Sequence, residues 1–385
     1  LVIAQVAISL VLTAGAGLLL RSLDGIHRGP GFDPRPIVLL RLRPSLVAYD
    51  AARAQEFQRA VILRLGAVPG VVAASPADRV PLPGWGEQVA VWLPGKEPDL
   101  PEHGLQSLSN RVGPKYFETL GLRLIAGREF GEGDRLGAPE VAIVNETLAR
   151  SLWPGTDPLG RSIVVDGTAY TVVGVAPDAQ YRNATQAPVP FLYTSFWQIP
   201  TIDRAPVDSR LHVRVAGDPR ALLPRIRSEI AAVDPDVPIS EDRPLTEWLD
   251  YSFQPVRVAG AILVTFGGLG LALSAIGLYG LLAFSVARRT REIAIRMALG
   301  ADARNLARSV VRRGVALVAA GAALGAAAVL MSARFVATLL FGVPAIDPIA
   351  MLGAAALLFA VAAIASYFPA RRAAAVDPVV ALRTE

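Results

Sequence analysis

The side chains that could do chemistry are few and lie far apart along this chain. Three histidines are present, and none has the HxxxH spacing that places two metal ligands on one helix face: His27, His103 and His212. Two acidic pairs lie in proline-punctuated loops, where we expect solvated carboxylates: Asp234 with Asp236, and Glu241 with Asp242. The absence of cysteine excludes a disulfide scaffold, a thiolate metal site and a cysteine nucleophile. We therefore predict no catalytic residues and no metal site.

Signatures of nucleotide binding and of serine catalysis are missing from the sequence as well. Gly95 and Lys96 are followed by Glu97, so the GxxxxGK[ST] loop that cradles phosphates is not formed there or elsewhere. No GxSxG motif presents a serine nucleophile. The glycine run at 267–270 lies inside an apolar stretch, which favours helix packing over phosphate binding. We expect a chain that is not an enzyme and that needs no cofactor.

The composition indicates membrane segments joined to a globular region. Hydrophobic residues make up 52% of the 385 residues and charged residues only 18%, against about 25% charged in ordinary soluble domains. The mean hydropathy is +0.42. Four stretches carry no charge over about 20 residues, which is the length needed to cross a ~30 Å hydrocarbon core: 1–20, 258–287, 314–333 and 348–370. We predict four transmembrane helices.

Small residues recur at helical spacing within two of these stretches. Gly277 and Gly280 are three residues apart, and Gly321 and Gly325 are four apart. Glycines on one helix side let two backbones approach closely, so we predict helix packing there. The alternative is that they only reflect a chain rich in alanine and glycine.

The charges of the loops predict the orientation of the helices. Residues 288–313 carry eight arginines and two acidic residues, a net charge of +6, which places this loop in the cytoplasm. Residues 24–255 carry 24 basic and 28 acidic residues, a net charge of −4, and belong outside. That balance also excludes a nucleic-acid surface.

The outside region alternates strand and helix patterns, which predicts a mixed α+β domain. Strand patterns over Ile37–Arg43 and Val71–Ala74 flank an amphipathic helix over Ala51–Leu65. Further signals are a type I′ hairpin turn at Asp166–Gly167 and a helix start at Asp218–Pro219. Two segments rich in proline and glycine predict long surface loops: Pro81–Gly95 and Gln186–Pro206.

The basic loop is the most informative segment of the chain. Thr290 can cap a helix in which Glu292 and Arg296 pair four residues apart, and Gly300 ends it. One interpretation is a basic helix lying on anionic lipid. Another is an apolar ridge, including Leu299, that docks into a groove of a cytoplasmic protein.

Several motifs closely resemble the permeases of the MacB/FtsX-like ABC transporter superfamily. In the last third these are IGLYGLLAFSVARR, TREIAIRMALGA, LLFGVPAIDPIA and YFPARRAAAVDPVVALRTE. In the outside region SLWPGTDPLGRSIVVDG, YTVVGVAPDAQYRN and AGDPRALLPRIRSEIAAVDPDVPI are similar to MacB-type periplasmic core motifs. The opening LVIAQVAISLVLTAGAGLLLRSL resembles the span that begins the C-terminal half of duplicated permeases of acidobacterial type, so we expect such a half or a processed product.

The resemblance implies an α-helical protein of the bacterial inner membrane with four transmembrane helices and an inserted α+β periplasmic domain of MacB-like type. The boundaries expected from it are a first helix at 1–23, a periplasmic domain at 24–255, a second helix at 256–287, a cytoplasmic coupling region at 288–313, helices at 314–340 and 348–370, and a tail at 371–385.

The function implied is that of an efflux permease that transmits the motion of an ABC ATPase, supplied in trans, to its periplasmic domain. The expected coupling residues are Thr290, Arg291, Glu292, Ile293, Ile295, Arg296, Met297, Leu299 and Gly300. Further expected partners are a second permease half or a second copy, a periplasmic adaptor and an outer-membrane channel. The alternative is an FtsX-like membrane scaffold that regulates a periplasmic enzyme such as a cell-wall hydrolase.

Overall fold

The computed structural model describes residues 2–27, 31–81, 87–100, 103–179, 188–198, 208–288, 303–339 and 348–374. The chain divides into two units. The helical unit comprises residues 1–24 and 254–385, and the inserted unit comprises residues 25–253. In chain order, the inserted unit therefore interrupts the helical unit after its first helix.

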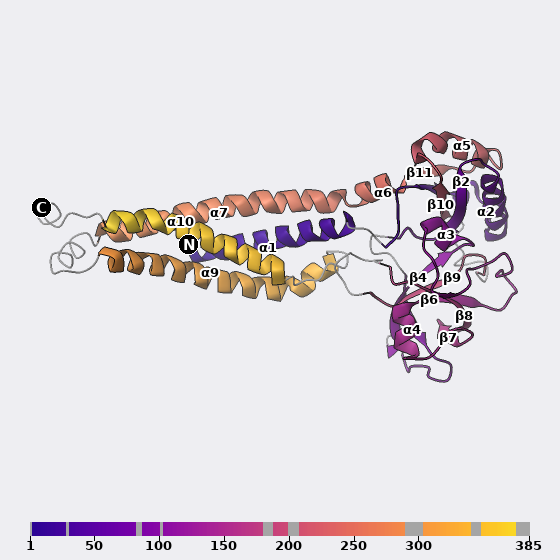
Figure 1. The fold of residues 1–385 in the computed structure, drawn as a ribbon, viewed down its shortest axis with the longest axis horizontal. Helices are drawn as coiled ribbons and strands as arrows, with labels where there is room; N and C mark the ends of the chain where they lie inside the picture. Colours follow the sequence, from indigo (N-terminus) through magenta and orange to yellow (C-terminus); the bar gives the residue numbers. More distant parts are fainter. Residues whose placement is uncertain are drawn as a thin grey trace, which may run out of the picture. The chain divides into compact units, whose positions relative to one another are not determined.

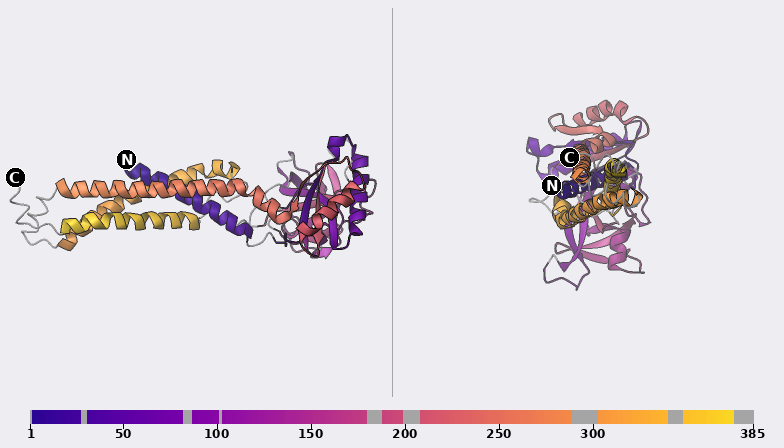
Figure 2. Two further views of the ribbon diagram at one scale, coloured as in Figure 1. Left: turned by 90° about the horizontal axis from the view of Figure 1, so that it is seen from above. Right: turned by 90° about the vertical axis from the view of Figure 1, so that its left-hand side faces the viewer.

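Four long apolar helices make up the described part of the helical unit and run alongside one another (Figures 1 and 2). They are α1 (Val2–His27), α7 (Gln254–Arg288), α9 (Ala303–Leu339) and α10 (Pro348–Ala374). Each contains a segment long and apolar enough to cross a membrane. Their shared core joins residues of all four, such as Leu10, Leu278, Val318 and Leu358. The prediction of four membrane-spanning helices is confirmed.

One half of the inserted unit has a ferredoxin-like topology, in which two βαβ units interleave their strands. The elements are β1 (Ile37–Leu42), a short 3-10 helix (Pro44–Val47), α2 (Ala51–Gly66), β2 (Val71–Ala77), β10 (Ser209–Val215), α5 (Pro219–Ala231), β11 (Ile239–Pro244) and α6 (Leu245–Ser252). Sheet order is β11-β1-β10-β2 with antiparallel neighbours. Helices α2 and α5 close one core over this sheet, with Phe57, Val61 and Ile226 inside it. We call residues 31–81 and 208–253 the ferredoxin-like lobe.

The other half is a closed barrel of six strands. Its elements are β3 (Glu87–Trp92), β4 (Leu105–Val112), β6 (Val141–Asn145), α4 (Glu146–Leu152), β7 (Ser162–Val165), β8 (Thr168–Ala176) and β9 (Phe191–Ser195), with β5 (Ala126–Gly127) added beside β8. The order β4-β3-β7-β8-β6-β9 closes on itself because β9 also pairs with β4. Apolar side chains such as Val91, Val144 and Ile163 fill its core. We call residues 87–198 the barrel lobe.

The two lobes meet at the short helix α3 (Tyr116–Leu120) and where β2 meets β4. There Ala77 pairs with Val112, backbone hydrogen bonds run from Asp78 N to the carbonyl oxygen of Arg111 and from Gly113 N to that of Pro76, and Asp78 forms an ion pair with Arg111. The side chains of Tyr116, Phe117 and Leu120 are fully buried at this junction. Aromatic rings from both lobes surround them, so the junction is filled by large side chains.

Local sequence patterns predicted many of these elements. The helix over 51–65 and the strands near 37–43 and 71–74 are confirmed. The helix start at Asp218 is confirmed as well, since the Asp218 side chain accepts a hydrogen bond from Arg220 N. The hairpin turn is confirmed too, because Asp166 and Gly167 both have positive φ, of 50° and 81°. This combination is that of a type I′ turn.

Two predicted loops were wrong. Strand β3 lies within 81–95 and β9 lies within 186–206, because pairing with β4 outweighs the local proline and glycine signals. The expectation of solvated carboxylates was wrong as well for the pair Glu241 and Asp242, whereas Asp236 of the other pair is exposed. Glu241 is half-buried and lies 3.5 Å from Arg41 Nη1 and 3.6 Å from Arg210 Nε. Asp242 pairs with Arg227.

Candidate functional site

The expected coupling residues, 290–300, lie outside the described residues. They fall in the segment 289–302, between the end of α7 and the start of α9. The nine positions concerned are Thr290, Arg291, Glu292, Ile293, Ile295, Arg296, Met297, Leu299 and Gly300. Their role therefore stays a prediction from the sequence.

The glycines of α9 lie directly against α1. A methyl group at Gly321 would lie 2.6 Å from Val6 Cβ and 2.9 Å from the carbonyl oxygen of Ile3. One at Gly325 would lie 2.8 Å from the carbonyl oxygen of Ala7. Carbon atoms do not approach so closely without displacement, so α1 and α9 pack backbone to backbone only because both positions are glycine.

Glycines of α7 approach α1 from another side. A methyl group at Gly277 would lie 3.3 Å from Gln5 Oε1, and one at Gly270 would lie 2.6 Å from Ser9 Oγ. At Gly280 it would meet no heavy atom within 4 Å in the described part of the chain. The structure thus brings three of the four predicted packing glycines, namely Gly277, Gly321 and Gly325, to one helix, and Gly280 lies apart from them.

Polar side chains of α1 recur every four residues on the side that meets α7. They are Gln5, Ser9 and Thr13. The Ser9 and Ser274 hydroxyl oxygens are 3.4 Å apart, and Thr13 Oγ1 donates to the carbonyl oxygen of Ser9 at 2.6 Å. Buried hydroxyl pairs of this kind hold helices in register inside a membrane. Glycines of α7 and hydroxyl groups on both helices therefore hold α1 against α7.

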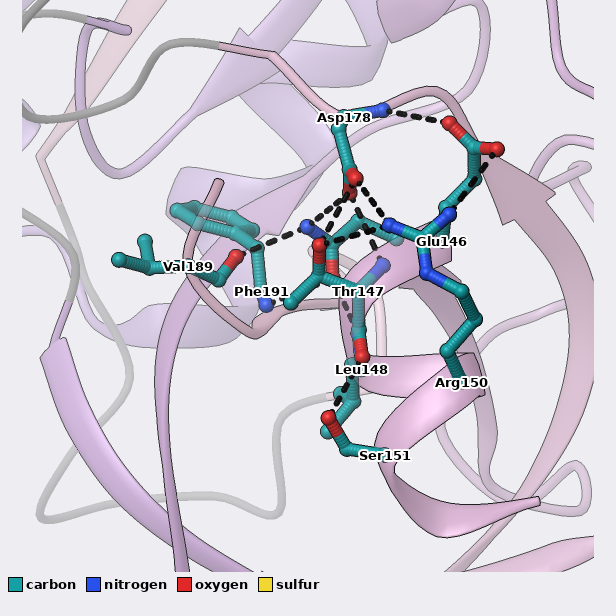
Figure 3. A network of polar contacts seen from close by, with 9 residues as sticks. Glu146, Thr147, Leu148, Arg150, Ser151, Asp178, Val189 and Phe191 are labelled. Carbon is teal, nitrogen blue, oxygen red and sulfur yellow. Dashed lines mark hydrogen bonds and ion pairs between the residues drawn. The ribbon is translucent and has the colours of Figure 1, made fainter. Parts of the chain in front are cut away.

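In the inserted unit, a network of polar contacts lies where α4 begins in the barrel lobe (Figure 3). The Asp178 carboxylate accepts hydrogen bonds from Thr147 N at 3.0 Å and Thr147 Oγ1 at 2.7 Å. It also accepts from Arg150 Nη2 at 2.8 Å and from Asn145 Nδ2 at 2.7 Å. Four donors from the end of β6 and from α4 thus converge on this one carboxylate.

Asn145 completes this network from the end of β6. Its Oδ1 accepts from Leu148 N and from Phe191 N, both at 2.9 Å. Its Nδ2 also donates to the carbonyl oxygen of Val189 at 2.9 Å (Figure 3). The side chain thus caps α4 and ties residues 178 and 189–191 together. Sequence reasoning did not find this clamp, since its members lie 30 to 46 residues apart.

Burial shifts the pKa values of two titratable groups of the inserted unit, His212 and Asp78. His212 in β10 is fully buried, and that burial lowers its pKa to about 4, so the imidazole is neutral. Burial raises the pKa of Asp78, which pairs with Arg111. Within the described residues, no group of three or more histidine, aspartate or glutamate side chains could hold a metal ion.

Comparison with known proteins gives two family matches. Residues 1–233 match the family model of the MacB-like periplasmic core domain, and residues 264–378 match that of the FtsX-like permease C-terminal region. Together they cover both units of the structure.

The individual relatives share less than a third of their aligned residues with this chain. The uncharacterized ABC transporter permease YvrN of Bacillus subtilis (strain 168) is 28% identical over 287 residues, which are 71% of this chain and 69% of YvrN. The macrolide export ATP-binding/permease protein MacB of Azoarcus sp. (strain BH72) is 28% identical over 68% of this chain. The pyoverdine export ATP-binding/permease protein PvdT of Pseudomonas syringae pv. tomato is 27% identical over 67% of it. Only 40% of each of these two exporters is covered.

Among solved structures, the periplasmic region of MacB from Actinobacillus actinomycetemcomitans aligns with 61% of this chain and 97% of its own, with a TM-score of 0.36 and 15% identity. The extracellular domain of the ABC-type transporter YknZ from Gram-positive bacteria aligns with 52% of this chain, with a TM-score of 0.34 and 19% identity.

Proposed function

Because this chain belongs to the MacB/FtsX-like ABC transporter permease family, we propose that it is a permease subunit that transmits the ATP-driven motion of a separate ATPase to its inserted unit. The observation that carries the proposal is α7. This helix begins at Gln254, directly after the residue that ends α6, and continues for 35 residues to Arg288. A helix of that length spans about 52 Å. Its two ends adjoin the inserted unit and the basic loop, so a displacement of the loop reaches the inserted unit through one rigid element.

Export is the activity that we extend to this chain from its relatives. MacB and PvdT are named for the export of macrolides and of pyoverdine, respectively. Both names also include an ATP-binding part, whereas this sequence contains no GxxxxGK[ST] loop. We propose an ATPase in trans as the partner, together with a second permease half or a second copy of this chain. The scaffold alternative gains no support from these names.

The proposal also sets the orientation in a bacterial inner membrane. Residues 24–255 lie in the periplasm and residues 288–313 lie in the cytoplasm, supported by the net charge of +6 in the latter. The test uses the absence of native cysteine. In intact cells, Leu63→Cys on the exposed face of α2 should react with a membrane-impermeant maleimide, and Asn305→Cys should react only after permeabilisation. The reverse pattern would show that the orientation is wrong.

Docking of the basic loop on the ATPase is the central step. Substitution of Glu292 distinguishes docking from lipid binding, because an acidic residue gains nothing from anionic headgroups. Truncation of a buried interface anchor costs about 1–2 kcal/mol or more, roughly a tenfold loss of affinity. We therefore expect Leu299→Ala and Glu292→Arg each to abolish ATPase co-purification and stimulation. Leu324→Ala, an apolar truncation on the exposed face of α9, is the matched control and should leave both unchanged.

Two outcomes would overturn the proposal. If both loop variants bind and stimulate the ATPase like the control, the loop is a membrane-surface element and does not dock. If the purified chain alone hydrolyses ATP with sensitivity to vanadate, it carries its own nucleotide site and is no passive subunit.

A further inference from the structure

The barrel lobe has no direct chain connection to the helical unit. Strand β1 is the first element after α1, and β11 with α6 precedes α7, so both connections enter the ferredoxin-like lobe. The barrel lobe is inserted between β2 and β10. Along the chain, a motion that starts in the helices therefore reaches the barrel lobe through the ferredoxin-like lobe and the junction between the lobes.

Helix α3 is the element that fills this junction. Its Tyr116 ring stands edge-on to His212 of the ferredoxin-like lobe, with centroids 5.8 Å apart. The adjacent Phe117 ring stands edge-on to Tyr193 of β9 in the barrel lobe, at 4.9 Å. Edge-to-face pairs at these distances are favourable and directional. The Tyr116 ring also lies 6.2 Å from Tyr193. One turn of helix therefore contacts both lobes through two adjacent rings.

The N-terminal end of α3 is bound by Glu129 of the barrel lobe. Lys115, at the capping position, has a φ of +60° and makes no side-chain cap. Instead, the Glu129 carboxylate accepts hydrogen bonds from Phe117 N at 3.3 Å and Glu118 N at 3.1 Å. These N–H groups would otherwise have no partner in the helix. Burial raises the pKa of Glu129, and the two N–H groups oppose that rise.

The C-terminal end of α3 is bound by Arg214 of the ferredoxin-like lobe. Its Nε donates to the carbonyl oxygen of Thr119 at 2.7 Å, and its Nη2 donates to the carbonyl oxygen of Asp33 at 3.4 Å. Asp33 belongs to the segment that follows α1. Gly121 ends the helix with a φ of +72°, and a methyl group there would lie 2.6 Å from Arg214 Nη2. Only glycine gives this turn and leaves room for the guanidinium.

We propose that Glu129 and Arg214 are positioning residues that fix α3 as a rigid strut between the lobes, so that the inserted unit moves as one body. The strut runs from Asp33, where the chain arrives from α1, through Arg214 and α3 to Glu129. The other attachment between the lobes lies where β2 meets β4, with the pair Ala77 and Val112, two backbone hydrogen bonds and the Asp78–Arg111 ion pair. Helix α3 adds a second attachment, and two attachments constrain the angle between the lobes more than one. The proposal rests on the proposed function for the source of the motion, but rigidity can be measured without it.

The experiment measures the distance between the lobes in the full chain. Spin labels are placed at Ser162→Cys in β7 and Ser228→Cys in α5, both exposed serines on regular elements, in a chain without native cysteine. Pulsed electron paramagnetic resonance in lipid nanodiscs should give one narrow distance distribution. Glu129→Gln and Arg214→Met should each broaden it, because one end of the strut is released. The matched controls Glu132→Gln and Arg220→Met change exposed residues of the same types and should not.

Folding is monitored in the same samples by tryptophan fluorescence, because all five tryptophans lie in the inserted unit: Trp85, Trp92, Trp153, Trp197 and Trp248. If Arg214→Met fails to fold, Gly121→Ala displaces the guanidinium without removing it and should broaden the distribution in its place. Unchanged widths in Glu129→Gln and in either of these variants would overturn the strut.

A second arm separates this proposal from the function on which it rests. The same labelled chain is bound to the ATPase and trapped with ADP and vanadate. An unchanged distance between the lobes supports one rigid body. A shifted distance would overturn the strut and leave the transmission of motion standing. If the chain does not stimulate the ATPase, the proposed function fails, and the widths measured without ATPase still decide the strut.

Discussion

The helical unit and the inserted unit are held together in opposite ways. Around α1, helix contact depends on the absence of side chains. Gly321 and Gly325 have no Cβ, so the backbones of α9 and α1 come within van der Waals distance. Around α3, contact depends on large side chains, of which Tyr116 and Phe117 are fully buried. Lipid gives helices no hydrophobic reason to associate, so close backbone approach must hold them. A domain in water gains about 25 cal/mol for each Å² of apolar surface that it buries.

This difference predicts opposite sensitivities. Adding atoms should damage the helical unit, and removing atoms should damage the inserted unit. Three of the four predictions below test this contrast directly, and the fourth tests the burial of His212. Each variant is paired with a substitution of the same kind at an exposed or open position.

The largest effect is expected for Phe117→Ala. Truncation of a buried phenylalanine costs about 3–5 kcal/mol, because it loses apolar burial and leaves a cavity. The midpoint of urea unfolding of the full chain in detergent, followed by tryptophan fluorescence, should fall accordingly. The control is Leu63→Ala, at a side chain that is 81% exposed on α2. Equal midpoints for the two variants would contradict a packed junction.

Gly321→Leu should come next, with a cost of about 3 kcal/mol from overpacking against Val6. The readout is the rate of maleimide labelling of Ser9→Cys, a fully buried position on α1, as SDS is raised. Labelling should begin at lower SDS in the variant. Gly353→Leu, where a methyl group meets no heavy atom within 4 Å in the described part of the chain, is the control. The sequence alone predicted helix packing at Gly321, and the structure places α1 of the same chain there.

His212 should make the inserted unit sensitive to acid. Its pKa is about 4 in the folded chain and about 6.5 when exposed, so the unfolded chain binds more protons between these values. Stability is therefore fully present above about pH 6.5 and is lost as the pH falls toward 4. The loss between pH 7.5 and 4.5 should be about 2–3 kcal/mol.

Urea unfolding of the full chain at these two pH values measures that loss. His212→Leu should reduce it, and His103→Leu, at an exposed position of the same unit, should not. An unchanged pH dependence in His212→Leu would show that the histidine stays charged or finds a proton acceptor in the folded chain.

The smallest effect on stability is expected from alanine substitutions at Gly325 and Gly280, which the sequence pattern does not distinguish. Gly325→Ala places a methyl group 2.8 Å from the carbonyl oxygen of Ala7, so a cost of about 1–2 kcal/mol is expected. Gly280→Ala places one in open space and should cost nothing. The Ser9→Cys labelling assay compares the two directly. Identical behaviour would favour a compositional origin of the glycine pattern over packing.

Sequence patterns predicted elements whose signals are local. The helix over 51–65 carries its own periodicity, and the turn at Asp166–Gly167 carries its own backbone preference. Strands β3 and β9 were missed because the pairing that forms them comes from β4, at a distance in the chain. Helix α3 has only five residues, and both of its ends are bound by side chains from elsewhere, Glu129 and Arg214. No local window contains that information.

The candidate sites show the same difference between local signals, which the sequence reveals, and contacts between distant residues, which it does not. Spacing alone indicated that Gly321 and Gly325 pack against a helix, but it could not indicate which helix, since that depends on the fold of the unit. The clamp of Asn145 and Asp178 joins residues 33 apart and leaves no periodic signal. The coupling residues come from resemblance and charge, and they remain a prediction.

The central claim is that the motion of an ATPase reaches the inserted unit through the loop at 288–313. The direct test is the distance between spin labels at Leu63→Cys in the inserted unit and Leu352→Cys, an exposed position of α10. In nanodiscs with the ATPase, trapping with ADP and vanadate should shift this distance in the otherwise native chain. The shift should vanish when Leu299→Ala and Glu292→Arg are introduced together. A distance that does not respond to trapping, or that responds equally with both loop substitutions present, would contradict the account.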